Sequence, residues 1–382
     1  MERTKVLRIG IIGTGGIADA HINGYLAFPD ECEIVALGDV VPGKAAQKAE
    51  SFGLDRAVAY DDPFAMLAEA DIDLVSVATP PSTHAALAIA ALDAGVHVLV
   101  EKPMAPSLDE CDAMIAAQKR SGKLLSVVAQ NRFRDDLAAL KAVVDSGLLG
   151  SISHVRVDSA WWRGLPYYDL WWRGTWEKEG GGSTLNHAIH HIDLLLWLLG
   201  RPSEVTAMLA NAQHDNAEVE DLSVAVFRYG RGLAQLTSSV VHHGEEQEIV
   251  VQGEYARVSQ PWSVIAERAR PDGFPEREGD ADLVARIEKL AADLEPLPHL
   301  GHAGQIGDLI DAIRTGRPPV ADAQDGRNAV ELVTAIYKAG FERTVVSLPL
   351  ASDDPYYRAG HLVESAPRFY EKRRSLAEAV AA

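Results

Sequence analysis

The sequence predicts a two-domain α/β protein: an N-terminal Rossmann domain with a doubly wound parallel sheet, then an α+β domain with a large open, mainly antiparallel sheet. Up to Gln130, short β-branched runs alternate with Ala-rich amphipathic stretches, and a glycine-rich turn follows the first run. After Asn131 longer runs alternate apolar and polar residues. A length of 382 residues fits two domains, which we place at residues 1–130 and 131–382.

The first domain is expected to consist of βαβ units, because parallel strands need a crossover and the intervening stretches are rich in Ala, Leu, Gln and Lys. The predicted strands are Leu7–Gly13, Glu33–Val40, Leu74–Ala78, Val96–Val100 and Leu124–Ala129.

The second domain carries strand patterns with hairpin-like turns, such as Tyr229–Gly232. A single apolar helix is predicted over Ser183–Leu199, stopped by Gly200 and Pro202. The predicted strands are Ser151–Ser159, Val205–Leu209, Val219–Tyr229, Gly232–Val240 and Gln247–Gln252. An exposed loop at Pro271–Glu278 and helices at Gly301–Thr315 and Ala323–Phe341 complete this domain.

The composition excludes several classes of partner. A net charge of −19 repels a phosphate backbone, so nucleic acid is not expected as a partner. No apolar stretch reaches the roughly 20 residues that span a bilayer, and no charged leader with a cleavage site precedes the first strand. Cys32 and Cys111 lack CxxC spacing, which argues against a disulfide framework. We expect a cytoplasmic protein without a membrane partner.

No metal site is predicted from the thirteen histidines. His242 and His243 are adjacent on a predicted strand and point to opposite faces. His299 and His302 have no carboxylate partner in the local sequence.

The first strand leads into Gly13–Ala18, which reads GTGGIA and fits the G-x-G-x-x-A fingerprint of dinucleotide sites. Gly13 permits the tight turn, and Gly15 lets backbone amides approach a pyrophosphate. The second strand ends at Asp39, whose carboxylate can accept from both ribose hydroxyls and would repel a 2′-phosphate, which favours NAD over NADP. The alternative is a plain strand–helix turn beside a solvated acid. The predicted cofactor-binding residues here are Gly13, Thr14, Gly15, Gly16, Ile17 and Asp39.

Two later strand ends carry Ala78–His84, which reads ATPPSTH, and Glu101–Pro103, which reads EKP. Ligands of open α/β sheets bind beyond the carboxyl ends of the strands, so both segments are expected at the cofactor. The additional predicted cofactor-binding residues are Ala78, Thr79, Pro80, His84, Glu101 and Lys102.

Taken in order, these motifs resemble those of the Gfo/Idh/MocA family, the group of glucose-fructose oxidoreductase and inositol dehydrogenase. The ATPPSTH segment looks like its ATP-x-x-x-H motif, and EKP like its EKP signature. Gly180–Gly182 and Asn186-x-x-x-His190, continuing to Asp193, are similar to its GGG…D-x-x-x-H-x-x-D stretch. The resemblance runs from about Val6 to Phe341.

The resemblance implies a nicotinamide between the two domains, with Lys102 and His190 at the reacting carbon. The chemistry leads to the same pair: oxidising a secondary alcohol needs a base with a pKa near working pH, and His190 suits that role. Lys102 can bind the same oxygen and stabilise alkoxide character. The alternative is a core histidine and a surface cation. The expected activity is NAD-dependent oxidation of a secondary hydroxyl in a sugar, sugar derivative or cyclitol.

Substrate-binding residues are predicted from local chemistry. Asn186 stands where the family usually has Asp, and we assign it to substrate orientation, since residues 186 and 190 share one face of the predicted helix. Five of the seven tryptophans lie near residues 161–176, where aromatic faces and Arg suit a sugar ring, although a plug or an oligomer interface has the same composition. The predicted contacts are Trp172, Arg173, Trp176 and Arg132; Arg132 resembles a family segment near the nicotinamide, but it can also simply begin a helix.

Two other functions fit this pattern: an NAD-dependent glycosidase that works by transient oxidation and elimination, and a non-catalytic dinucleotide-sensing regulator of the same fold. An open sheet with one uncovered apolar face also predicts a homodimer or homotetramer.

Overall fold

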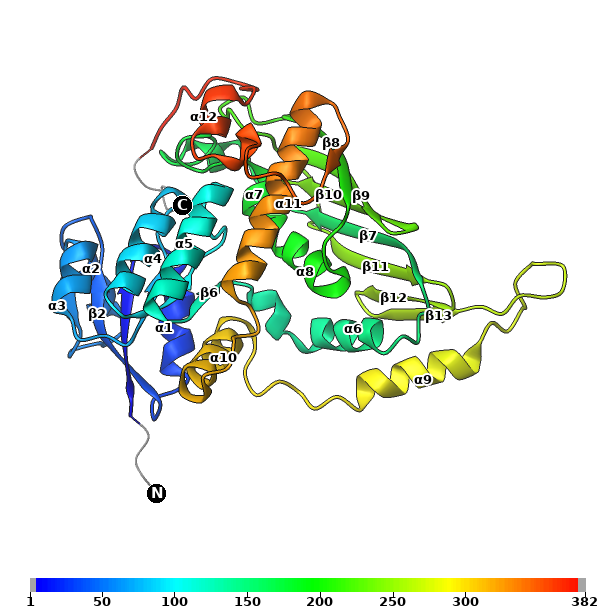
Figure 1. The fold of residues 1–382 in the computed structure, drawn as a ribbon, viewed down its shortest axis with the longest axis horizontal. Helices are drawn as coiled ribbons and strands as arrows, with labels where there is room; N and C mark the ends of the chain where they lie inside the picture. Colours follow the sequence, from blue (N-terminus) through cyan, green and yellow to red (C-terminus); the bar gives the residue numbers. More distant parts are fainter. Residues whose placement is uncertain (1–4, 377–382) are drawn as a thin grey trace. The chain divides into compact units, whose positions relative to one another are not determined.

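The computed structural model describes residues 5–376, which divide into two compact units (Figure 1). Of the described residues, the first unit contains 5–133, Pro298–Val330 and Arg358–Gly360. The second unit contains Arg134–Leu297, Glu331–Tyr357 and residues 361–376.

The first unit is built on a six-stranded parallel sheet in the order β3-β2-β1-β4-β5-β6, which confirms the predicted doubly wound domain. Its strands are β1 (Leu7–Ile12), β2 (Cys32–Gly38), β3 (Val58–Tyr60), β4 (Leu74–Val77), β5 (His97–Val100) and β6 (Leu125–Val127). All five predicted strands are present. The sequence analysis missed β3, an edge strand of three residues whose side chains are partly or fully exposed and therefore carry no apolar pattern.

Helices complete the core of this unit. They are α1 (Ala18–Leu26), α2 (Lys44–Ser51), α3 (Pro63–Glu69), α4 (His84–Asp93), α5 (Leu108–Ser121) and α10 (Gly301–Thr315). Short 3-10 turns follow β4 at η1 (Pro81–Thr83) and β6 at η2 (Gln130–Phe133).

Helix α10 corrects the predicted domain boundary, because the sequence analysis assigned Gly301–Thr315 to the second domain. In the structure α10 packs beside α1, and its Ile306 and Leu309 share one buried core with Ile9 of β1 (Figure 1). Gln305 strengthens this attachment: its Oε1 accepts from the backbone N–H of Ala129 at 2.9 Å. An apolar helix face does not reveal in sequence which of two sheets it will cover.

The second unit is built on an eight-stranded sheet in the order β13-β12-β11-β7-β10-β9-β8-β14. Its strands are β7 (Ile152–Ala160), β8 (Glu204–Ala210), β9 (Leu222–Tyr229), β10 (Gly232–Ser239), β11 (Gln247–Gly253), β12 (Ala256–Gln260), β13 (Ser263–Ala266) and β14 (Val346–Ser347). Only the β7–β10 pair is parallel, so the prediction of a mainly antiparallel sheet is confirmed. The sequence analysis missed β12, β13 and β14.

Helices cover one face of this sheet, where α6, α7, α8 and α9 contact its strands. The helical elements are α6 (Asp135–Asp145), η3 (Leu165–Asp169), α7 (Ser183–Asn186), α8 (Ile189–Leu199), α9 (Ala281–Ala292), η4 (Pro355–Tyr357) and α12 (His361–Ser365). Helix α11 (Ala323–Glu342) starts in the first unit and ends in the second. In the part of the chain that the structure describes, none of the helices is long and apolar enough to cross a bilayer.

The other face of the sheet carries exposed apolar side chains. Buried and exposed side chains alternate along β9: Ala225 and Phe227 are buried, whereas Val224 and Val226 are exposed. The strand register places further apolar residues on this exposed face. We call Met208, Val224, Val226, Leu233 and Ile265 the outer-face patch.

The predicted single helix over Ser183–Leu199 is wrong at one point. The structure has two helices, α7 and α8, with His187 and Ala188 between them. Both Ala188 and His187 bond back to the carbonyl of Ser183, which closes α7 before α8 begins. Asn186 and His190 are therefore not related by the regular four-residue spacing of one helix.

Candidate active site

The glycine turn has the geometry that a dinucleotide requires. Gly13 has a φ of +89°, and a Cβ on it would lie 2.6 Å from the carbonyl oxygen of Ala78, so only glycine fits. At Gly15 and Gly16 a Cβ would meet no heavy atom within 4 Å. This open space lies at the start of α1, where backbone N–H groups can face an anion.

Asp39 is bound to that same turn. Its Oδ2 accepts from the backbone N–H of Thr14 at 2.9 Å and from the Thr14 hydroxyl at 2.7 Å, and its Oδ1 accepts from the N–H of Val41 at 3.0 Å. Although burial acts to raise the pKa of Asp39, hydrogen bonds from Val41 and Thr14 and the charge of Lys44 hold it below the usual value. Asp39 is thus an ionised acceptor beside the glycine turn.

Lys44 is a cation that the sequence analysis did not consider. Its Nζ lies 3.5 Å from Asp39 Oδ2, at the first position of α2. A side chain five residues further along the chain can therefore reach the carboxylate of Asp39.

His84 joins the two later strand ends. The residue is fully buried, and its Nδ1 lies 2.8 Å from the carbonyl oxygen of Pro103 while its Nε2 lies 2.8 Å from that of Thr79. Burial lowers the pKa of His84 despite these two carbonyls, so the ring stays neutral and donates to one of them. Its place favours a positioning role over direct contact with a cofactor.

Lys102 directly follows a buried carboxylate at the end of β5. Glu101 is 4% exposed, and its Oε2 accepts from the backbone N–H of Lys102 at 3.1 Å. The side chains of Glu101 and Pro103 are buried, whereas that of Lys102 is half-buried. Within the EKP segment, only the lysine side chain is accessible to a ligand.

Arg132 is a correction. The sequence analysis expected it to bind substrate, but it is 5% exposed, and its guanidinium donates to the carbonyl of Val320 at 2.9 Å and to Asp325 at 3.0 Å. These bonds tie η2 to the segment that precedes α11 and to the first turn of α11. Arg132 is a structural residue of the first unit.

In the second unit, Asn186 and His190 lie on either side of the break between α7 and α8. Both are half-buried, whereas the three residues between them and His191 are buried. The Asn186 amide donates to the carbonyl of Gly181 at 3.0 Å, so part of its hydrogen-bonding capacity holds the glycine run. Burial lowers the pKa of His191 to about 4, which keeps that neighbour neutral and leaves His190 as the more accessible imidazole.

The glycine run is required by close packing against Glu220 and Tyr337, which are distant in sequence. A Cβ on Gly182 would lie 1.8 Å from the carbonyl oxygen of Glu220, and one on Gly181 would lie 2.2 Å from the Tyr337 hydroxyl. The Glu220 carboxylate accepts from Thr184 N–H at 3.0 Å, Gly182 N–H at 3.2 Å and Tyr337 OH at 3.0 Å. We call Glu220, Tyr337, Gly182 and Thr184 the Glu220 network.

The Glu220 network was not predicted from the sequence. Burial raises the pKa of Glu220 to about 7, and the hydrogen bonds from Thr184 and Tyr337 only partly offset it. A pair of acids, Glu220 and Asp221, inside the predicted strand Val219–Tyr229 was the available signal, because a buried strand does not ordinarily carry adjacent charges.

The aromatic segment holds a stacked arginine. The guanidinium of Arg173 lies 4.1 Å from the ring centres of both Trp172 and Tyr167 and donates to Glu179 at 3.0 Å. Burial raises the pKa of Glu179 to about 6, against the opposing charge of Arg173. Trp172 and Arg173 are half-buried, so they keep surface for a ligand.

Trp176 is a second correction. It was expected to contact substrate, but it is 2% exposed, with Tyr337 and Phe341 edge-on at 5.3 and 5.7 Å. Its indole N–H donates to the carbonyl of Pro367 at 3.3 Å. Trp176 therefore packs in the core, as the alternative of a plug predicted.

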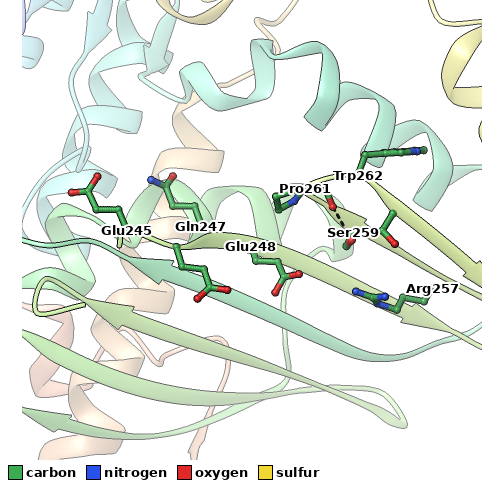
Figure 2. Close-up of a pocket in the computed structure, with 9 residues that line it drawn as sticks. Glu245, Gln247, Glu248, Arg257, Ser259, Pro261 and Trp262 are labelled. Atoms are coloured by element: carbon green, nitrogen blue, oxygen red, sulfur yellow. Dashed lines mark hydrogen bonds between the residues drawn. The ribbon is translucent and has the colours of Figure 1, made fainter. Parts of the chain in front are cut away.

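A separate hollow of about 580 Å³ lies at one end of β11 and β12 (Figure 2). Figure 2 shows the carboxylates of Glu245 and Glu248 and the side chains of Arg257 and Trp262 along this hollow. None of the predicted site residues lines this hollow.

Comparison with known families decides the assignment. Residues 7–129 match the oxidoreductase family with the NAD-binding Rossmann fold, Gfo/Idh/MocA, and residues 137–259 match the C-terminal domain of the same family. The chain belongs to the Gfo/Idh/MocA family. It is accordingly an NAD-dependent oxidoreductase of the dehydrogenase type, as predicted.

Family members of known activity cover nearly the whole chain. D-glucoside 3-dehydrogenase of Escherichia coli is 26% identical and covers 90% of this chain and 97% of its own. Myo-inositol 2-dehydrogenase of Thermotoga maritima is 26% identical and covers 90% of this chain and 98% of its own. The WlbA dehydrogenase of Bordetella pertussis, solved with NADH and UDP-GlcNAcA, is 29% identical, with a TM-score of 0.77 over 91% of this chain and 100% of its own.

Proposed function

We propose that this Gfo/Idh/MocA protein oxidises a secondary hydroxyl of a sugar, sugar derivative or cyclitol by hydride transfer to NAD. Lys102 and His190 act at the reacting hydroxyl. His190 removes the hydroxyl proton, Lys102 stabilises the alkoxide that develops on the same oxygen, and the hydride leaves the same carbon for the nicotinamide. The relatives named above are dehydrogenases of glucosides and inositol, which supports this substrate class.

The observation that carries the proposal is that Lys102 and His190 are more exposed than the residues on either side of them. Lys102 alone of the EKP segment is half-buried, and His190 is half-buried while Ile189 and His191 on either side are buried. A lysine and a histidine kept accessible in this way fit groups that must meet a ligand.

The remaining site residues have supporting roles in this proposal. The predicted cofactor residues Gly13, Thr14, Gly15, Gly16, Ile17, Asp39, Ala78, Thr79 and Pro80 hold the dinucleotide. Trp172 and Arg173 contact the ring of the substrate, since a stacked pair with exposed surface suits the C–H face and the vicinal hydroxyls of a sugar. Asn186 orients the substrate from its half-buried position at the end of α7, where its amide donates to the carbonyl of Gly181.

The test is NADH formation with a panel of glycosides, aldoses, uronate derivatives and cyclitols. A dehydrogenase converts NAD to NADH in proportion to the oxidised product. A glycosidase of this fold would release free sugar without net NADH, and a dinucleotide-sensing regulator would bind NAD and turn over no member of the panel. Either of the last two results would overturn the proposal.

The assembly and the location are part of this proposal. The outer-face patch supports a homodimer or homotetramer, because a second copy would cover apolar side chains such as Met208, which is 80% exposed. Light scattering of the purified protein tests this, with a monomer as the contradicting result. Cys32 and Cys111 are buried thiols, the form that a reducing cytoplasm maintains.

A further inference from the structure

Three metal-binding side chains from distant segments meet inside the first unit. His21 lies on α1, Glu101 follows β5, and His302 is the second residue of α10. One ligand atom from each of the three side chains lies within 4.8 Å of the other two. Glu101 Oε1 lies 3.0 Å from His21 Nε2 and 3.8 Å from His302 Nε2.

We propose that His21, Glu101 and His302 bind a divalent transition-metal ion of the zinc class, with a fourth position open to water. Two imidazole nitrogens and a carboxylate oxygen are ligands that zinc prefers. Bonds of about 2.0–2.1 Å to a tetrahedral ion place ligand atoms roughly 3.3 Å apart. Small changes in side-chain torsions would bring the three ligand atoms to this separation.

The surroundings of His21 suit a metal ligand. Its other nitrogen, Nδ1, lies 3.0 Å from the hydroxyl of Ser76, and the Tyr25 hydroxyl lies 2.8 Å from the same oxygen. A hydrogen bond from Nδ1–H to Ser76 leaves the Nε2 lone pair directed at the cluster. Both His21 and Ser76 are fully buried, so this orientation is held by packing.

The carboxylate of Glu101 also suits a cation. Its Oε1 faces the two imidazoles, at 3.0 Å from His21 Nε2 and 3.8 Å from His302 Nε2. Its second oxygen, Oε2, accepts from the backbone N–H of Lys102 at 3.1 Å.

Hydrogen bonds among the three side chains do not account for the position of His302. Its Nε2 is buried and has no hydrogen-bond partner within residues 5–376, since Glu101 Oε1 at 3.8 Å is beyond hydrogen-bond distance. A bound metal would satisfy this atom. The side chain of His302 is 19% exposed, which gives an ion access to the cluster.

This inference differs from the sequence-based expectation of no metal site. His302 has no carboxylate near it in sequence, and the packing of α10 on the first unit brings it to Glu101. The site does not depend on the proposed dehydrogenase activity, because its ligands can be tested by binding alone.

The experiment uses the full chain without a histidine tag, dialysed against EDTA and then equilibrated with zinc sulfate. We expect one zinc ion per chain by elemental analysis and a cobalt(II) absorption spectrum of tetrahedral type when cobalt chloride replaces zinc. His302→Ala, the most exposed ligand, should weaken zinc binding at least about tenfold.

His299→Ala is the matched control, because His299 packs on Phe28 outside the cluster and should leave zinc binding unchanged. Thermal unfolding without metal verifies that both variants fold. Absence of stoichiometric zinc in the unaltered protein, or equal binding by His302→Ala and the unaltered protein, would overturn the site and leave a hydrogen-bonded network.

Discussion

The two units use glycine for opposite purposes. In the first unit a Cβ at Gly15 would project into open space, so no other part of the protein requires glycine there. In the second unit a Cβ at Gly182 would collide with the Glu220 carbonyl 1.8 Å away, so the residue is needed by the protein itself. Packing therefore explains Gly182, whereas Gly15 is explained by the dinucleotide that we propose binds at this turn.

The largest effect on stability is expected from an alanine substitution at Gly182, compared with the same substitution at Gly15. Gly182→Ala should destabilise the protein by more than about 3 kcal/mol, because the added methyl group overlaps backbone that cannot rotate away. Gly15→Ala, the matched control, should leave the unfolding free energy nearly unchanged and weaken NAD binding. Urea unfolding and NAD titration measure the two effects. Equal stability of the two variants would refute the assigned difference.

The next effect concerns the tryptophans. Trp176→Ala should reduce the unfolding free energy by about 3–5 kcal/mol, because it empties a core position beside Tyr337 and Phe341. Trp172→Ala should cost less stability and raise KM for the substrate. Denaturation curves and Michaelis profiles separate the two, and a KM effect confined to Trp176→Ala would restore the original prediction for that residue.

A smaller effect is expected at the cofactor end. Asp39→Ala should weaken NAD binding about 10- to 100-fold through the loss of charged hydrogen bonds. NADP should lose much less, because Lys44 is then released to face a 2′-phosphate. Fluorescence titration with both cofactors decides, and an equal loss for NAD and NADP would contradict the role of Asp39.

The smallest effect is a pH dependence of stability. An acid whose folded pKa is raised to about 7, as for Glu220, binds its proton more tightly in the folded state than in the unfolded chain. Its contribution therefore makes stability fall as pH rises from the usual Glu pKa toward 7. Glu220→Gln should make the melting temperature less dependent on pH over this interval. An unchanged pH profile in Glu220→Gln would contradict the raised pKa.

The two units also differ in how much of their structure could be predicted from the sequence. The cofactor half was predictable because its determinants are local: Gly13, Thr14 and Asp39 lie at the ends of two adjacent strands. The strand pattern also predicted, without any knowledge of packing, that Lys102 follows the end of β5. Only long-range attachments, such as α10, were missed there.

The substrate half was less predictable because its determinants are distant in sequence. Gly181 and Gly182 are explained by Glu220 and Tyr337, and Trp176 is buried by partners from α11. Composition identified the aromatic segment but could not tell a stacked, half-exposed Trp172 from a core Trp176. That distinction depends on tertiary packing alone.

The central claim is that Lys102 and His190 act on the same reacting hydroxyl. Its most direct test is the turnover of Lys102→Ala and His190→Ala with NAD and a substrate from the panel, alongside NAD affinity. The account predicts that each variant binds NAD normally and that kcat falls about 10²- to 10⁴-fold. Near-normal turnover in both variants would contradict it.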